Sequence, residues 1–252
     1  MNRRLPPGSI VGIFLINATA YSRDMMPRFL VLLLFLITAV CSPPLRSQER
    51  KLEPIDEARS DLSWAHFKNR LLEAVMKRDR KFVLGILDRD VRIGVDGVRG
   101  IAEFSKQWHL DADDSPLWRD LPVALFLGAA YVKRGQLPRE LCAPYLLARW
   151  PRDMDPHAYG ALISRDVLVK AAPSSDSQTV VSLSHVIVPV ADWEVADTAP
   201  GHPQKWVKIK LKTGEGFVPE EQIRSPIEQV ACFIKIGNGW RLTAFAPAGG
   251  SY

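Results

Sequence analysis

The stretch KWVKIKLKTGEGFVP, residues 205–219, decides the fold predicted for the second half of this chain. Its first half alternates in character, which is typical of a β-strand with one buried and one solvated face. The aliphatic set is Val207, Ile209 and Leu211, and the opposite set is Trp206, Lys208, Lys210 and Lys212. Residues 213–216 (TGEG) favour a turn, and Phe217 and Val218 favour a second strand. The stretch therefore predicts two strands joined by a turn.

The flanking residues continue this all-β pattern. Residues 167–170 (VLVK) lead into the small residues 171–174 (AAPS), and a polar loop separates them from the apolar run 180–190. The pattern has an opening strand with an Ala-Pro-Ser loop, then a Trp-Val-x-Ile strand, then a Gly-aromatic-Val strand before a short turn. This order resembles a bacterial Src-homology-3 (SH3) domain. The resemblance spans roughly residues 164–225 and implies a small barrel, to which we assign residues 160–226. Phe217 stands where the family more often has Trp or Tyr.

A β-hairpin is predicted after the barrel, over residues 227–247. Val230, Cys232, Ile234 and Ile236 alternate with other residues, and residues 237–239 (GNG) form a hairpin turn before Trp240. Two placements are open. The hairpin either extends the sheet of the barrel or packs back on the first half of the chain, in which case the barrel is an insertion.

The first half of the mature chain, residues 61–158, predicts an α+β domain that is mostly helical. Trp64, Phe67, Leu71 and Val75 recur at helical spacing, and an alternating strand pattern follows at residues 91–96. The order helix, helix, strand, helix over residues 62–108 resembles the opening of nuclear-transport-factor-2-like cone folds. A further helix after Pro116 departs from that family, in which sheet would follow.

The predicted fold class is thus an α+β front domain followed by an all-β SH3-like small barrel and a C-terminal hairpin. Residues 48–60 are charged and lack periodicity, which is typical of a linker. The mature chain as a whole resembles bacterial envelope proteins with a helical front half and such a barrel, a resemblance that implies no activity.

A targeting segment precedes these domains. Arg28 is followed by the apolar run Phe29–Val40, which is too short as a helix to cross a bilayer of about 30 Å. This pattern predicts a signal peptide at residues 26–47 and a periplasmic or secreted protein. Residues 1–25 then form a spurious N-terminal extension. In the alternative, Cys41 carries the lipid of an anchored lipoprotein.

The positive charge of the chain belongs mostly to the leader. The net charge is +5, but five of the basic residues and one acidic residue lie in residues 1–47, which leaves 28 basic and 27 acidic residues. A nucleic-acid interface needs a clustered basic surface. We therefore expect no nucleic-acid partner, and contact with a membrane only through the signal peptide or a lipid on Cys41.

Two cysteines remain after the leader, Cys142 and Cys232. In an oxidising compartment they are candidates for a disulfide, which would tie the C-terminal hairpin to the front domain. The alternative is two separately buried thiols.

No catalytic signature is present. The five histidines are isolated, and no nucleophile elbow, phosphate loop or dinucleotide fingerprint occurs. We expect no cofactor and no metal, and a binding function rather than an enzyme. The alternative is a cell-envelope hydrolase that uses a pocket in residues 61–158.

The candidate ligand site is the outer face of the central hairpin. If the aliphatic side chains fill the barrel, Trp206 stands outward beside Lys208 and Lys210, with Phe217 on the neighbouring strand. An exposed aromatic ring beside cations suits a peptide or a cell-wall polymer. The alternative is that Trp206 packs against Trp240 or the front domain.

Overall fold

The computed structural model describes residues 49–248, except for residues 95, 134, 136, 137, 200, 202 and 203. Residues 48–252 form one compact unit. The signal peptide, the N-terminal extension and a lipid on Cys41 concern residues outside the described part and remain predictions. Among the described residues, no helix is long and apolar enough to span a membrane.

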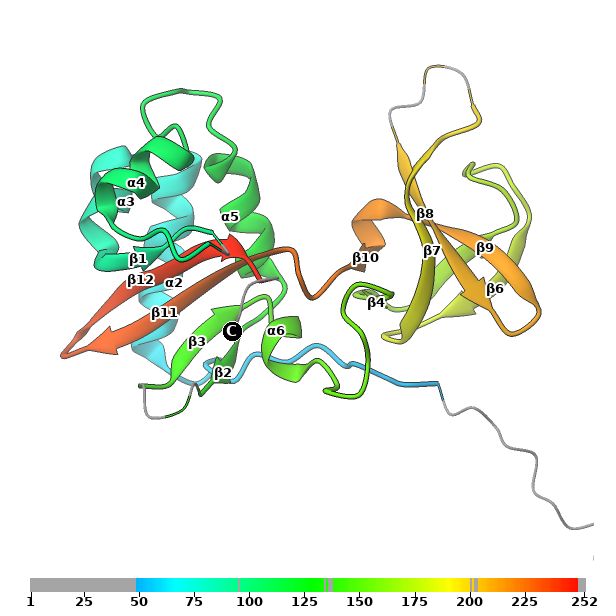
Figure 1. The fold of residues 1–252 in the computed structure, drawn as a ribbon, viewed down its shortest axis with the longest axis horizontal. Coiled ribbons are helices and arrows are strands. Elements are labelled where there is room, and N and C mark those ends of the chain that lie inside the picture. Colours follow the sequence, from blue (N-terminus) through cyan, green and yellow to red (C-terminus); the bar gives the residue numbers. More distant parts are fainter. Residues whose placement is uncertain are drawn as a thin grey trace, which may run out of the picture. The chain divides into compact units, whose positions relative to one another are not determined.

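The first of two sheets has five strands in the order β1-β12-β11-β3-β2 (Figure 1). Strands β1 and β12 are parallel, and the other pairs are antiparallel. The strands are β1 (Leu87–Arg92), β2 (Ala130–Val132), β3 (Glu140–Ala143), β11 (Gln229–Ile236) and β12 (Gly239–Pro247).

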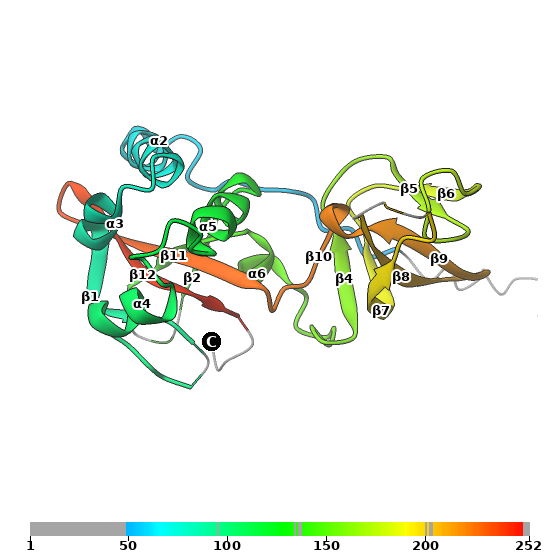
Figure 2. The ribbon, with the colours of Figure 1, turned by 90° about the horizontal axis from the view of Figure 1, so that it is seen from above.

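Helices from the first half of the chain pack on this sheet. They are α2 (Leu62–Met76), α3 (Arg80–Ile86), α4 (Ile101–Gln107), α5 (Leu117–Phe126) and the short α6 (Leu146–Arg149). Figure 2 shows α2, α3 and α5 beside the β11–β12 hairpin, which they contact. Trp64 and Leu71 on α2 share one buried core with Phe233 and Phe245 of the hairpin. This apolar core stabilises the five-stranded sheet.

The C-terminal hairpin belongs to this first sheet. Strand β11 pairs with β3, and β12 pairs with β1, so the last strands of the chain lie among its first ones. Of the two placements that the sequence left open, the structure has the return to the front half. The second sheet is therefore inserted between β3 and β11.

The second sheet has seven strands in the order β10-β4-β7-β8-β9-β5-β6. They are β4 (Tyr159–Leu162), β5 (Val167–Lys170), β6 (Thr179–Leu183), β7 (Ile187–Ala196), β8 (Lys205–Leu211), β9 (Gly214–Pro219) and β10 (Ile223–Arg224), with a 3-10 turn, η1 (Glu220–Gln222), before β10. The first residues of β7 pair with β4 and the later ones with β8. Within the described residues the sheet stays open, with β10 and β6 at its edges, so no closed barrel forms.

The segment predicted to be a linker is packed in its described part. Lys51 forms a β-bridge with Val186, and the Leu52 amide donates to the His185 carbonyl at 2.7 Å. Leu52 is buried. The segment forms a single β-bridge and no full strand. A single bridge does not produce the alternation of apolar and polar residues by which a strand is predicted.

Candidate ligand-binding groove

Strand β8 contributes side chains to the core of the second sheet and, through Trp206, to a groove on the surface of that sheet. Val207 and Ile209 are fully buried in the core of the second sheet, as the alternation predicts. Lys208 and Lys210 lie on the opposite face, where Lys208 is half-buried and Lys210 is exposed. The pleat of this strand therefore separates an apolar interior from a cationic outer face.

Trp206 does not stand outward as predicted, because only 1% of its surface is exposed. Its Cα partners are Val195 on β7 and Pro219 on β9, so neighbouring strands flank it on both sides. The indole Nε1 donates to Asp197 Oδ2 at 2.9 Å. Trp240, one of the two partners in the predicted alternative, packs on Trp64 in the core of the first sheet.

A groove of about 390 Å³ opens at this end of the second sheet. Trp206 and Pro219 form its apolar floor, and Leu168, which is 48% exposed, forms one wall. The other lining residues are Arg165, Asp166, Lys170, Ser175, Gln204 and Gln222. The groove thus combines apolar contact with charged and amide groups, as ligand sites commonly do.

Hydrogen bonds hold the charged rim of the groove in place. The Asp166 amide donates to Ser184 Oγ at 2.8 Å, and Asp166 has a φ of 52°, in the left-handed region that Asp tolerates better than most residues. Lys170 Nζ donates to the Ser177 carbonyl at 3.0 Å and to Thr179 Oγ1 at 3.3 Å. Arg165 is exposed. Two cations and one carboxylate leave one net positive charge along the rim.

Only one of the four predicted ligand residues lines this groove. Phe217 is half-buried and faces Lys208 across the β8–β9 ladder, so it lies on the same outer face. Lys208 Nζ forms an ion pair with Glu215 Oε2 at 2.6 Å. Lys208, Lys210 and Phe217 therefore continue the face away from Trp206 without lining the groove.

Sequence reasoning missed Arg165, Leu168 and Pro219. Pro219 was within reach, because register in a hairpin follows from its turn. Leu211 pairs with Gly214, and counting outward from that pair places Pro219 opposite Trp206. Arg165 and Leu168 gave no signal, since they come from another hairpin whose contact with β9 is not visible in any local pattern.

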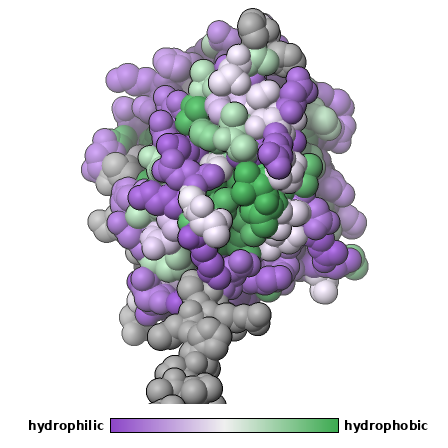
Figure 3. Space-filling view, turned by 90° about the vertical axis from the view of Figure 1, so that its right-hand side faces the viewer, coloured by the Kyte–Doolittle hydropathy of each residue, from purple (hydrophilic) through white to green (hydrophobic). Residues whose placement is uncertain are grey.

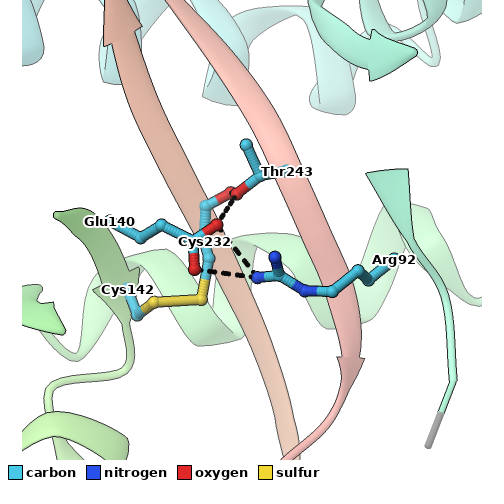
Figure 4. The surroundings of a disulfide bond; sticks show 5 residues. All are labelled: Arg92, Glu140, Cys142, Cys232 and Thr243. Carbon is cyan, nitrogen blue, oxygen red and sulfur yellow. Dashed lines mark hydrogen bonds and ion pairs between the residues drawn. A yellow bond between two sulfur atoms is a disulfide. The ribbon is translucent and has the colours of Figure 1, made fainter. Parts of the chain in front are cut away.

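A disulfide joins β3 of the front half of the chain to β11 of the C-terminal hairpin. Cys142 on β3 and Cys232 on β11 are directly opposite each other, with an S–S distance of 2.09 Å (Figure 4). Glu140 lies beside them and accepts hydrogen bonds from Arg92 Nη2 at 3.0 and 2.9 Å and from Thr243 Oγ1 at 2.5 Å.

Glu140 and the two cysteine sulfurs lie close enough together to share an ion. A sulfur bound in a disulfide is not a thiolate ligand, however, and the carboxylate is already bound by Arg92 and Thr243. In this oxidised state the cluster is a buried structural network.

The front domain has a separate groove of about 570 Å³ beside α4. Asp96, Glu103, Lys106 and His109 contribute titratable side chains to its lining, and all four residues are exposed. His66, which also lies in this half of the chain, is exposed on α2. Catalytic side chains commonly have pKa values that burial has shifted. The exposed side chains of this groove are well solvated and lack that burial.

Asp61 is the front-domain carboxyl with the most perturbed acidity. Its Oδ1 accepts hydrogen bonds from Ser63 Oγ at 2.6 Å and from the Ser63 amide at 2.8 Å, and Lys235 Nζ lies 3.2 Å from Oδ2. The hydrogen bond from the Ser63 side chain is the largest cause that lowers the pKa of Asp61 to about 2. This carboxylate caps α2 and has a structural role.

No protein-family model matches the chain, and no curated protein or solved structure is significantly similar to it.

Proposed function

We propose that this protein is an exported cell-envelope protein whose second sheet is an SH3-like binding module for a peptide or the peptide part of peptidoglycan. The observation that carries the proposal is the groove between Trp206, Pro219 and Leu168 with its charged rim. An apolar floor gives affinity, and a rim with one net positive charge favours a ligand that carries a carboxylate.

The arrangement of the strands supports the SH3-like part of the proposal. An opening strand, a hairpin, the Trp-Val-x-Ile strand β8 and the Gly-Phe-Val strand β9 follow in that order, and the short turn η1 comes next. SH3 domains bind extended peptides in aromatic-lined grooves. Pro219 and Gln222 bring the turn to the groove, so the sequence motif and the cavity coincide.

The disulfide supports the exported part of the proposal. Disulfides persist in oxidising compartments such as the periplasm and the extracellular space. The apolar run Phe29–Val40 predicts the route to such a compartment. The front domain then serves as the stable body that carries the binding module.

The test is binding of the compact unit, residues 48–252, to purified peptidoglycan and to soluble acidic stem peptides. Arg165→Glu reverses one of the two cations on the rim, and we expect it to weaken binding about fivefold to thirtyfold, by roughly 1–2 kcal/mol. Lys210→Glu is the matched control, because Lys210 is also an exposed cation of this part of the chain but does not line the groove.

Co-sedimentation with peptidoglycan and calorimetric titration with the peptides measure both variants. Equal loss in the two variants would mean that overall charge, and not the groove, controls binding. No binding to either probe would contradict the proposed ligand class.

A cell-envelope hydrolase remains the second candidate, because the front groove brings Asp96, Glu103 and His109 to one lining. Under this alternative the purified protein would cleave peptidoglycan, and Glu103→Gln or His109→Ala would abolish cleavage while leaving binding at the Trp206 groove unchanged. We expect no release of soluble fragments from peptidoglycan.

A further inference from the structure

A larger groove, of about 620 Å³, adjoins the 3-10 turn η1, and we call it the η1 groove. Its lining comes from α5, from the start of β8 and from residues 220–229. The two sheets share a buried core in which Tyr145 lies with Ala161 and Ile187. This core holds the walls of the groove within one compact unit.

The η1 groove and the Trp206 groove are lined by the same two stretches of chain, the start of β8 and the turn that follows β9. The residues of these stretches that line the Trp206 groove are Gln204, Trp206, Pro219 and Gln222, and those that line the η1 groove are Lys205, Glu220 and Glu221. Successive side chains of a strand point to opposite faces. The start of β8 and the turn η1 therefore separate two neighbouring grooves.

One wall of the η1 groove is apolar. Helix α5 contributes Val123, Ala124 and Leu127 to it, and Pro144 lies beside them. Val123 is 42% exposed, although it is an aliphatic residue of a helix. A wall of this kind offers contact to the alkyl part of a ligand side chain.

The rest of the lining is charged, and carboxylates outnumber cations by four to three. The carboxylates are Asp120, Glu220, Glu221 and Glu228, and the cations are Arg119, Lys205 and Arg224. Two of the cations already have a partner in the groove. Arg119 Nε lies 2.7 Å from Asp120 Oδ1, and Arg224 Nε lies 3.6 Å from Glu228 Oε2.

Glu220 and Glu221 are the carboxylates that remain. Both are exposed, and among the described residues neither forms an ion pair. Burial raises the pKa of the neighbouring Glu228, and the charge of Glu220 acts in the same direction. Added positive charge in this groove is therefore stabilised by carboxylates that the protein itself leaves without a cation.

The surface of the second sheet suits a ligand of mixed character. Figure 3, which shows the side on which Figure 1 draws this sheet, has apolar side chains surrounded by hydrophilic ones. The rim of the Trp206 groove carries one net positive charge, and the η1 groove carries one net negative charge. A peptide with a carboxylate and an amine is complementary to this pair of grooves.

We propose that the η1 groove binds a side-chain amine of the peptide whose carboxylate lies at the rim of the Trp206 groove. This inference rests on the proposed function and narrows its ligand to an acidic peptide with a free primary amine. The alkyl chain of the amine packs on Val123 and Leu127, and the ammonium group donates hydrogen bonds to Glu220 and Glu221. Acylation of the amine removes its charge, so a peptide whose amine is joined to a second peptide binds less tightly.

Two synthetic peptides that differ only at the amine test the proposal. Both are tetrapeptides of alanine, glutamate, lysine and alanine, and the lysine amine is free in one and acetylated in the other. Calorimetric titration into residues 48–252 measures their affinities. We expect acetylation to weaken binding about threefold to tenfold, as loss of one partly solvated charge contact does.

The double variant Glu220→Gln/Glu221→Gln should bind both peptides equally, with the affinity that the unchanged protein has for the acetylated one. Glu194→Gln is the matched control, because Glu194 is an exposed glutamate of β7 that lines neither groove. It should keep the preference for the free amine. Arg165→Glu should weaken both peptides by the same factor, because it acts on the carboxylate alone.

Equal affinity of the unchanged protein for the two peptides would overturn this inference and leave the proposed function standing. A preference for the free amine that Glu220→Gln/Glu221→Gln leaves intact would also overturn it, since the amine would then bind elsewhere. Absence of binding by either peptide would contradict both proposals.

Discussion

At the scale of single residues, Trp206 connects the groove to the stability of the second sheet. Its indole is buried between the partners Val195 and Pro219, and its N–H donates to Asp197. A residue in this position cannot be a removable surface anchor. The groove uses it as a rigid floor, and the exposed residues Arg165 and Leu168 are the ones through which affinity can be changed without unfolding the sheet.

Trp206→Ala should therefore destabilise the protein strongly. Removal of a buried tryptophan typically costs about 3–5 kcal/mol, and the change also leaves Asp197 without the indole N–H. Trp206→Phe keeps most of the ring and should cost less, since a net hydrogen bond contributes about 1 kcal/mol. Urea unfolding measures both. Lys210→Ala is the surface control. If Trp206→Ala has the same free energy of unfolding as this control, the indole ring does not belong to the core.

Asp61 predicts an acid-dependent contribution to stability. Its folded pKa of about 2 lies below the usual aspartate value of about 3.9, because the Ser63 hydroxyl and other donors favour the carboxylate. A lowered pKa stabilises the fold above the unfolded value, and this contribution is lost as the pH falls from about 4 through about 2.

Asp61→Ala should accordingly lower the thermal midpoint at pH 7, and its difference from the unchanged protein should shrink as the pH falls below about 4. Thermal scans over pH 2–7 measure this difference. Asp113→Ala is the control, because Asp113 is exposed and no hydrogen bond of its side chain is described. A difference that stays constant down to pH 2 would contradict a role for the charged carboxylate.

At the scale of secondary-structure elements, the disulfide and the C-terminal hairpin act together. Strand β11 is held to β3 by Cys142–Cys232 and by backbone pairing, while β12 pairs with β1. The linked cysteines are 90 residues apart in sequence. The loop that they close contains the whole second sheet, so the bond limits the unfolded chain across the insertion.

The double variant Cys142→Ser/Cys232→Ser should reduce the free energy of unfolding by roughly 2–4 kcal/mol. Comparison of its urea midpoint with those of the oxidised and the reduced protein measures the effect. The reduced protein should resemble the double variant. If reduction has no effect although thiol titration shows two free cysteines, the bond does not stabilise the hairpin.

At the scale of the whole molecule, the predicted signal peptide and the disulfide are both typical of a protein in an oxidising compartment. Fusion of residues 26–60 to a reporter that is active only outside the cytoplasm should give a signal, because the apolar run after Arg28 has the length of a signal-peptide core. Mass spectrometry should place the mature N-terminus between Ser42 and Gln48. Replacement of Leu32 by Arg is the control that should abolish export, and an intact leader on the native protein would contradict the prediction.

Much of the local structure was predictable from sequence. Helical spacing of Trp64, Phe67 and Leu71 predicted a helix that the structure has at Leu62–Met76, and the alternation at residues 205–211 predicted β8 with its correct buried face. Both patterns repeat with the period of the backbone itself. A helical first part and a mostly β second part follow from such patterns alone.

The groove was predictable only in part. Alternation placed Trp206 on the outer face, but it could not reveal that the long strand β7 and Asp197 bury the ring. The side chains that complete the groove, Arg165 and Leu168, come from a hairpin more than thirty residues earlier. Their approach to β9 depends on strand order, which no single segment specifies.

The sequence by itself determined the periods of the helices and strands, the apolar run Phe29–Val40 and the presence of Cys142 and Cys232, because these can be read from residues that are close together along the chain. Only the tertiary structure decided that β11 and β12 join the first sheet, that Cys142 faces Cys232, and that β6 is left as an open edge. The physical reason is that sheet pairing is chosen among segments far apart in sequence. Backbone hydrogen bonds are alike for every strand, so the choice falls to the packing of whole apolar faces.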